Sequence, residues 1–235
     1  MKRFLRAVLR LVPRGTVVRV FSGQLRGARW LMHSATHGCW LGTYERDSQA
    51  VFARLVSRGD VVLDIGANVG FFTILASRLV GREGTVCAFE PLPRNVELLK
   101  EHVRLNAASN VRVFAVAVAS TIGRASFEVA GSPSMGRLAE TGSIEVETAS
   151  LDSFWRSGAL SLPTFMKIDV EGAEYEVLTG ARELLDAARP AILLAAHGYV
   201  QHDACVALLK DAGYDIQTIR DGTADGDYLL LARAQ

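Results

Sequence analysis

The segment VVLDIGANVGFFT, residues 61–73, decides the fold of this chain. It begins as an apolar run of strand type, passes through two glycines and continues in a helical pattern. Gly66 and Gly70 give the spacing D-x-G-x-x-x-G, which is neither the dinucleotide fingerprint nor a P-loop. Ligands of open α/β sheets bind outside the carboxyl ends of the strands, so a ligand is predicted to lie against this turn.

Two acids end neighbouring strands of the same unit. Asp64 precedes the first glycine, and Glu90 closes the next strand, TVCAFE at 85–90. An acid before the turn opposes a pyrophosphate and suits a cationic ligand, whereas an acid after the second strand accepts ribose hydroxyls. A nucleoside with a positive charge and no phosphate meets both demands. We therefore predict S-adenosylmethionine as the cofactor, with Gly66 allowing its close approach and Asn68 capping the next helix.

Strands and helices alternate along the chain, which predicts a mostly parallel sheet covered on both faces. Strands are expected at 61–65, 85–90, 111–118, 164–170 and 191–196, and helices at 71–79, 93–106, 173–185 and 201–212. The last two strands, 215–219 and 228–233, are joined by a tight turn, so they must be antiparallel to each other. Residues 129–148 are rich in Gly and Ser, which predicts a mobile or ligand-shaped loop.

An N-terminal extension, residues 1–45, is predicted ahead of one domain at 46–235, with a hairpin of two short strands within 17–32. Residues 1–30 hold eight Lys and Arg and no acid, which leaves 18 basic against 25 acidic residues in the rest. Within 3–14, apolar and arginine side chains would lie on opposite faces of a helix. Such a helix could make peripheral contact with a membrane, or pack on the body or on a partner subunit of a homodimer; packing is favoured.

Composition is that of a soluble globular protein. The chain is 49% hydrophobic and 22% charged, which is enough for one large core. No apolar run reaches the roughly 18 residues that span a bilayer. Cys39, Cys87 and Cys205 lie far apart, without the spacing of a metal site or a disulfide framework. Reduced thiols and a cytoplasmic location are therefore expected.

Longer stretches resemble the FkbM family of S-adenosylmethionine-dependent methyltransferases. The resemblance runs from HGCWLGTYE (37–45) to the C-terminus and is carried by GDVVLDIGANVGFFT (59–73), CAFEPLPRNVELLKEHVRLN (87–106), VETASLDSF (146–154) and MKIDVEGAEYEVLTGA (166–181). It implies the class I methyltransferase fold, an α/β Rossmann-like architecture whose seven-stranded, mostly parallel sheet has an antiparallel last strand. It also implies methyl transfer, most often to a hydroxyl oxygen of a sugar, polyketide or other metabolite.

The resemblance also implies the cofactor-binding positions. Asp64, Gly66, Ala67, Asn68, Gly70 and Phe71 would form the turn, Glu90 beside Pro91 would hold the ribose, Ala117 and Val118 would lie near the adenine, and Tyr44 and Glu45 would close over the cofactor. The family often has an acid shortly before a histidine after the fifth strand. Here Ala195 and Ala196 precede His197, so no partner for this histidine is evident.

The acceptor end of the site is predicted from FMKIDVEGAEYEVL, residues 165–178. Strand alternation puts Lys167 and Asp169 on one face, and Asp169, Glu171 and His197 should meet at the carboxyl rim of the sheet. A hydroxyl acceptor needs a proton acceptor within reach, and His197 is the first choice because its ordinary pKa is near 6.5. Asp169 would orient the acceptor or the cofactor, and Lys167 would pair with Asp169 or steady a developing alkoxide.

Other features of this stretch leave alternatives open. Asp169 and Glu171 offer oxygen ligands for a divalent metal, but no third ligand is evident, so no metal is predicted. Glu174 and Glu176 are interpreted as acids that favour a helix start. The predicted function is an O-methyltransferase acting on a small-molecule hydroxyl. A binding or scaffold protein on the same fold is the alternative, and an RNA methyltransferase is less favoured because the body is acidic, so no nucleic acid partner is expected.

Overall fold

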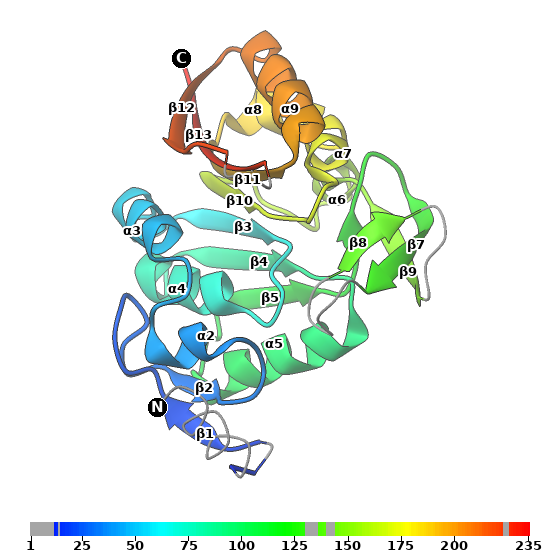
Figure 1. Cartoon of the computed structure of the whole chain (residues 1–235). Coiled ribbons are helices and arrows are strands. Elements are labelled where there is room, and N and C mark those ends of the chain that lie inside the picture. The colour runs from blue at the N-terminus through cyan, green and yellow to red at the C-terminus, as the bar shows by residue number, and fades with distance from the viewer. Residues whose placement is uncertain (1–11, 14, 130–135, 140–143, 223–225) are drawn as a thin grey trace.

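A seven-stranded sheet forms the centre of the molecule (Figure 1), and its strand order is β12-β13-β11-β10-β3-β4-β5. The computed structural model describes residues 12–13, 15–129, 136–139, 144–222 and 226–235. The strands are β3 (Val61–Ile65), β4 (Thr85–Phe89), β5 (Val111–Phe114), β10 (Phe165–Ile168), β11 (Ala191–His197), β12 (Tyr214–Arg220) and β13 (Asp227–Ala234). All neighbours pair in parallel except β13, which is antiparallel to both β11 and β12. The predicted fold class is confirmed.

Helices cover both faces of this sheet (Figure 1). They are α2 (His37–Leu41), α3 (Arg46–Leu55), α4 (Phe71–Val80), α5 (Pro93–Leu105), α6 (Leu151–Arg156), α7 (Glu174–Thr179), α8 (Arg182–Ala188) and α9 (Tyr199–Asp211). Strand alternation divides the core between the faces, because Leu63 packs with the α6 to α9 side and Val62 with the α3 and α4 side. The same alternation turns Asp64 toward the α4 side, where Thr73 meets it.

The N-terminal hairpin is present and packs on the main body. Strands β1 (Val17–Arg19) and β2 (Arg29–Leu31) pair in antiparallel fashion, as predicted. Trp30 is fully buried and its ring stacks on His102 of α5, with the ring centroids 3.7 Å apart. The hairpin therefore shares a core with the helices beside the glycine turn. The helix expected at 3–14 falls almost entirely outside the described residues.

His102 connects this hairpin to the glycine turn. The backbone N–H of Leu31 donates to Nε2 over 3.1 Å, so Nε2 carries no proton. Nδ1 must then hold the proton, and it donates to the carbonyl of Val69 over 2.7 Å. Burial lowers the pKa of His102 to about 4, in agreement with a neutral ring.

The structure has a second, four-stranded sheet where the sequence predicted the end of one strand and a loop. Its order is β6-β9-β7-β8, from β6 (Ala117–Val118), β7 (Gly123–Val129), β8 (Gly136–Ala139) and β9 (Ile144–Ala149). The prediction of one strand at 111–118 is wrong, since the chain leaves the central sheet after β5 and pairs β6 with β9. The prediction of a loop across 129–148 is also wrong where the structure describes it, because β8 and β9 both pair with β7.

The helix expected at 173–185 is divided into α7 and α8. The break comes at Gly180, where a Cβ would lie 2.2 Å from the carbonyl oxygen of Ala119. This close backbone approach requires glycine, and α7 ends at the preceding residue, Thr179. Asp152 then accepts hydrogen bonds from the backbone N–H groups of Glu183 and Leu184, over 3.2 and 2.9 Å, and so satisfies the first turn of α8.

The three cysteines are buried free thiols, as expected for reduced residues. Cys87 lies in the core on β4. In the part of the chain that the structure describes, no helix combines the length and the apolar character that crossing a membrane requires.

Candidate active site

A cavity of about 410 Å³ opens at the carboxyl ends of β3, β4 and β10. Of the predicted site residues, those on its wall are Tyr44, Glu45, Gly66, Ala67, Asn68, Phe71, Glu90, Pro91, Ala117, Val118, Lys167, Asp169 and Glu171. Asp64, Gly70 and His197 are not on the wall. The cavity therefore brings together predicted residues from five separate stretches of sequence.

The glycine turn lies directly against the end of β10. Gly66 has φ +78°, and a Cβ there would lie 1.8 Å from the carbonyl oxygen of Asp169. The N–H groups of Gly66 and Ala67 both donate to the carbonyl of Phe89, over 3.0 and 2.9 Å. The turn is thus fixed between β4 and β10, and only glycine fits at its first position.

Asn68 does not cap α4, contrary to the sequence prediction. The N-cap position belongs to Gly70, which has no side chain to accept a hydrogen bond from the first turn. The side chain of Asn68 accepts instead from the N–H of the next residue, Val69, over 2.7 Å. Its own N–H donates to Glu90 Oε2 over 2.8 Å, which joins the turn to the end of β4.

Glu90 is held in place on the cavity wall by hydrogen-bond donors. Oε1 accepts from the N–H of Leu92 over 3.0 Å and from Nδ2 of Asn95 over 3.2 Å. Burial raises the pKa of Glu90, and these hydrogen bonds with that of Asn68 counteract part of the rise. Asn95 and Leu92 also line the cavity, and sequence reasoning missed both. Their only signal was that they lie two and five residues after Glu90.

Asp64 has a different place from the one predicted. It is fully buried, and its Oδ2 accepts from Thr73 Oγ1 over 2.6 Å. Its Oδ1 lies 3.8 Å from Lys167 Nζ. Burial raises the pKa of Asp64, while Lys167 and Thr73 counteract the rise. Asp64 therefore contacts Lys167, which lines the cavity, and does not line the cavity itself.

Lys167 lies between two carboxylates. Its Nζ is 3.0 Å from Asp169 Oδ2 on the cavity side and 5.0 Å from the centre of the Phe72 ring. Burial disfavours the charge, but Asp169, Asp64 and Glu45 together raise the pKa of Lys167 above its ordinary value. Of the two predicted roles, pairing with Asp169 is the one present in the structure.

Asp169, Glu171 and His197 meet at the sheet rim, as predicted. His197 Nε2 lies 3.7 Å from Asp169 Oδ1 and 3.7 Å from Glu171 Oε2. The rim forms because β10 lies between β3 and β11, so the ends of these strands are adjacent.

Glu174 is the partner of His197 that the sequence did not reveal. Its side chain is fully buried, and Oε1 lies 2.8 Å from His197 Nδ1 and accepts from the N–H of Gly172 over 2.9 Å. The interpretation of Glu174 as an acid that only starts a helix is therefore wrong. The only sequence signal was its position three residues after Glu171.

The surrounding acids change the protonation of His197. Burial lowers its pKa, but Glu174, Asp169 and Glu171 more than counteract this and raise it to about 9. The expectation of an ordinary pKa near 6.5 is wrong for this arrangement, because at neutral pH the ring already holds both protons. Burial works against ionisation of Asp169, but Lys167 and His197 lower its pKa. Burial raises the pKa of Glu171.

The geometry agrees with a comparison to protein families. A model of the methyltransferase FkbM domain matches residues 64–216. The chain belongs to the FkbM methyltransferase family. The resemblance found in the sequence is thereby confirmed, and the protein is a methyltransferase.

Relatives of this FkbM methyltransferase include a curated protein and solved structures. The hexuronic acid methyltransferase AglP of Haloferax volcanii is 29% identical over 191 residues, covering 80% of this chain and 77% of the relative. The FkbM methyltransferase of Methylobacillus flagellatus superposes with a TM-score of 0.56 at 20% identity over 83% of this chain and 53% of that one, so this chain spans about half its length. An O-methyltransferase of Thermotoga maritima gives 0.57 at 14% identity, over 98% and 81% of the two chains. These two structures show the fold.

Proposed function

We propose that this FkbM methyltransferase transfers the methyl group of S-adenosylmethionine to a hydroxyl oxygen of a small molecule, and that the acceptor is a sugar acid. One observation carries the proposal: the fixed Glu90 and the rim cluster of Asp169 and Glu171 line the same cavity. The Glu90 carboxylate can accept hydrogen bonds from the ribose hydroxyls of a nucleoside. The carboxylates of Asp169 and Glu171 can accept a hydrogen bond from the hydroxyl of an acceptor. The name of the Haloferax relative supports a hexuronic acid as the acceptor.

The cavity wall has the chemistry that the cofactor needs. Gly66 leaves the backbone open to close approach, and Glu90 offers buried oxygens for the ribose hydroxyls. Ala117 and Val118 supply an apolar surface for the adenine. When bound, S-adenosylmethionine supplies an activated methyl group on a positively charged sulfur. The carboxylates of the wall favour that charge.

The residues at the rim would align the acceptor. Lys167 holds Asp169 by one oxygen, so that the other oxygen faces His197. The carboxylates of Asp169 and Glu171 can accept a hydrogen bond from a hydroxyl and then its proton. Alignment of this kind accounts for a large share of the rate in a displacement reaction.

Binding of the cofactor product tests the first half of the proposal. Isothermal titration with S-adenosylhomocysteine should show one site, and Glu90→Ala should weaken it at least tenfold. Glu97→Ala is the matched control, because Glu97 is exposed on α5 and away from the cavity. Absence of binding would favour a scaffold protein on the methyltransferase fold.

The acceptor is tested with methyl-labelled cofactor. Hexuronic acids should be methylated and the corresponding neutral hexoses should not. A hexuronic acid has both hydroxyl and carboxyl oxygens, so the product must be treated with mild base. A base-stable methyl ether supports the proposal, and a base-labile methyl ester would contradict transfer to a hydroxyl.

A further inference from the structure

Three side-chain atoms that can bind a metal ion lie close together at the rim. His197 Nε2 is 3.7 Å from both Asp169 Oδ1 and Glu171 Oε2, and the three groups offer atoms that all lie within 4.8 Å of one another. Within the described ranges, no other group of three His, Cys, Asp or Glu side chains converges in this way. A separation of 3.7 Å is too long for a hydrogen bond. It is short enough for two atoms to share one ion at about 2.1–2.3 Å each.

The histidine is oriented as a metal ligand would be. Glu174 is fully buried and its Oε1 lies 2.8 Å from His197 Nδ1, so Nδ1 holds a proton and Nε2 is the nitrogen directed at the two acids. A cation bound at Nε2 would take the place of the second proton that the ring holds at neutral pH. A carboxylate behind the ring is the usual companion of a metal-binding histidine, because it fixes the tautomer and the ring plane. His197 Nδ1 lies at hydrogen-bond distance from Glu174, whereas Nε2 and the two rim carboxylates are far enough apart to leave space for an ion between them.

Asp169 is also held from behind. Lys167 Nζ donates to Asp169 Oδ2 over 3.0 Å, which leaves Oδ1 directed toward His197. The ion pair therefore fixes which oxygen of Asp169 faces the histidine.

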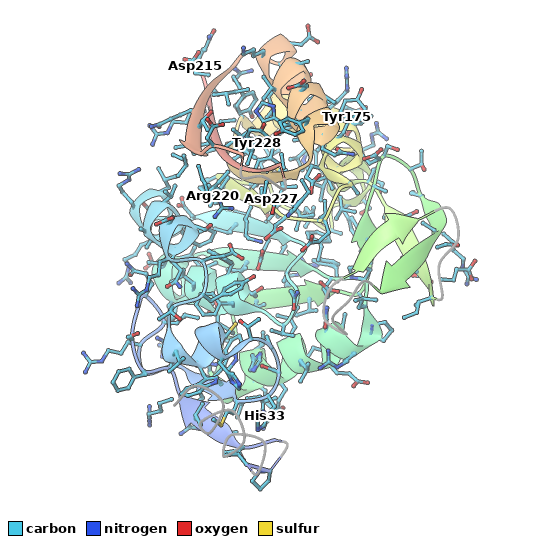
Figure 2. All side chains as sticks on the ribbon, viewed as in Figure 1. His33, Tyr175, Asp215, Arg220, Asp227 and Tyr228 are labelled. Atoms are coloured by element: carbon cyan, nitrogen blue, oxygen red, sulfur yellow. The ribbon has the colours of Figure 1, made fainter. Side chains whose placement is uncertain are left out.

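The rim carries more acid than base. Asp169, Glu171 and Glu174 surround His197. Asp227 at the start of β13 and Arg220 at the end of β12 add one acid and one cation nearby. Figure 2 labels Arg220 and Asp227 on these two strands. A cation placed among the three acids would offset this excess.

We propose that Asp169, Glu171 and His197 bind a divalent cation with mixed oxygen and nitrogen preference, of which Mn²⁺ is representative, at the acceptor end of the cavity. Three protein ligands leave coordination positions free for oxygens of the acceptor, such as a hydroxyl and a neighbouring carboxylate. This last part rests on the proposed function, whereas the ion site itself does not.

Manganese binding to the full chain tests the site directly. After chelator treatment, the protein should bind one Mn²⁺ in an electron paramagnetic resonance titration, and His197→Ala and Asp169→Asn should each weaken binding at least tenfold. Glu174→Ala should weaken it by about tenfold as a positioning change, with Glu174→Gln restoring part of the affinity. His202→Ala is the matched control, because His202 forms a separate pair with Asp203 at 2.8 Å.

Four results would overturn the inference or separate it from the proposed function. Absence of Mn²⁺ binding, with S-adenosylhomocysteine binding intact, overturns the ion site alone. Tight Mn²⁺ binding that survives His197→Ala also overturns it. Pulsed electron paramagnetic resonance of Mn²⁺ bound to the unaltered protein does not depend on whether a variant folds. Coupling of the ion to one imidazole nitrogen supports the site, and absence of that coupling rejects it. Loss of S-adenosylhomocysteine binding in the unaltered protein would count against the proposed function only.

Discussion

Lys167 of β10 lies opposite Asp64 of β3 in the parallel ladder, and its Nζ is 3.8 Å from Asp64 Oδ1. The pair is buried in the middle of the sheet, where two apolar residues would be easier to accommodate. Lys167 also reaches Asp169, which lines the cavity. A buried acid, a lysine and a rim acid therefore form one continuous chain of charges from the core to the site.

Removal of Lys167 should lower the free energy of unfolding. Lys167→Met leaves Asp64 and Asp169 without their common cation, and breaking a buried pair in this way costs about 3–5 kcal/mol. Urea unfolding should show the loss, and the double variant with Asp64→Asn should recover part of it. If the double variant were no more stable than the single one, the coupling would be refuted.

Two glycines with positive φ should respond differently to alanine. In Gly66→Ala the new Cβ would lie 1.8 Å from the Asp169 carbonyl oxygen, so the turn must move and S-adenosylhomocysteine affinity should fall at least 100-fold. Gly59→Ala is the control, since φ is +84° and nothing lies within 4 Å of its Cβ. It should cost only about 1 kcal/mol of backbone strain and leave affinity unchanged. Equal losses of affinity in the two variants would show that the close approach does not matter.

His102 should make the fold sensitive to acid. Its pKa falls from an ordinary 6.5 to about 4 on folding, so the unfolded chain binds the extra proton first. The stabilisation is complete above pH 6.5 and is lost as the pH falls toward 4, by about 3 kcal/mol in total. Urea unfolding between pH 7.5 and pH 4.5 measures this. In His102→Gln the free energy of unfolding should vary less over that range, and an identical variation would contradict the assignment.

The strands of the central sheet and the position of the cofactor turn could be predicted because each depends on local sequence. A short apolar run followed by a glycine turn, such as 61–65, is typical of a buried strand, and a parallel sheet places the carboxyl ends of its strands at one edge. The sheet containing β7 and β9 was missed because Gly, Ser and Pro in the connecting segments obscure the alternation in Gly123–Val129 and Ile144–Ala149.

The protonation of the rim could not be predicted from spacing. Glu174 lies at a helix start, and its burial depends on β11 bringing His197 against it from 23 residues away. The raised pKa of His197 depends in turn on three carboxylates that meet only in the folded chain. Residue type alone predicts a histidine pKa near 6.5, because it takes no account of neighbouring charges.

The stacking of Trp30 on His102 has a consequence for attempts to shorten the protein. A chain starting at residue 46 would lack both the indole that covers this imidazole and the Leu31 N–H that fixes its tautomer. The His102 ring would then be exposed to water and could take up a second proton near neutral pH. Its hydrogen bond to the Val69 carbonyl would weaken. The hairpin is thus the outer support of the glycine turn, and trimming it should damage the cofactor end of the cavity from a distance.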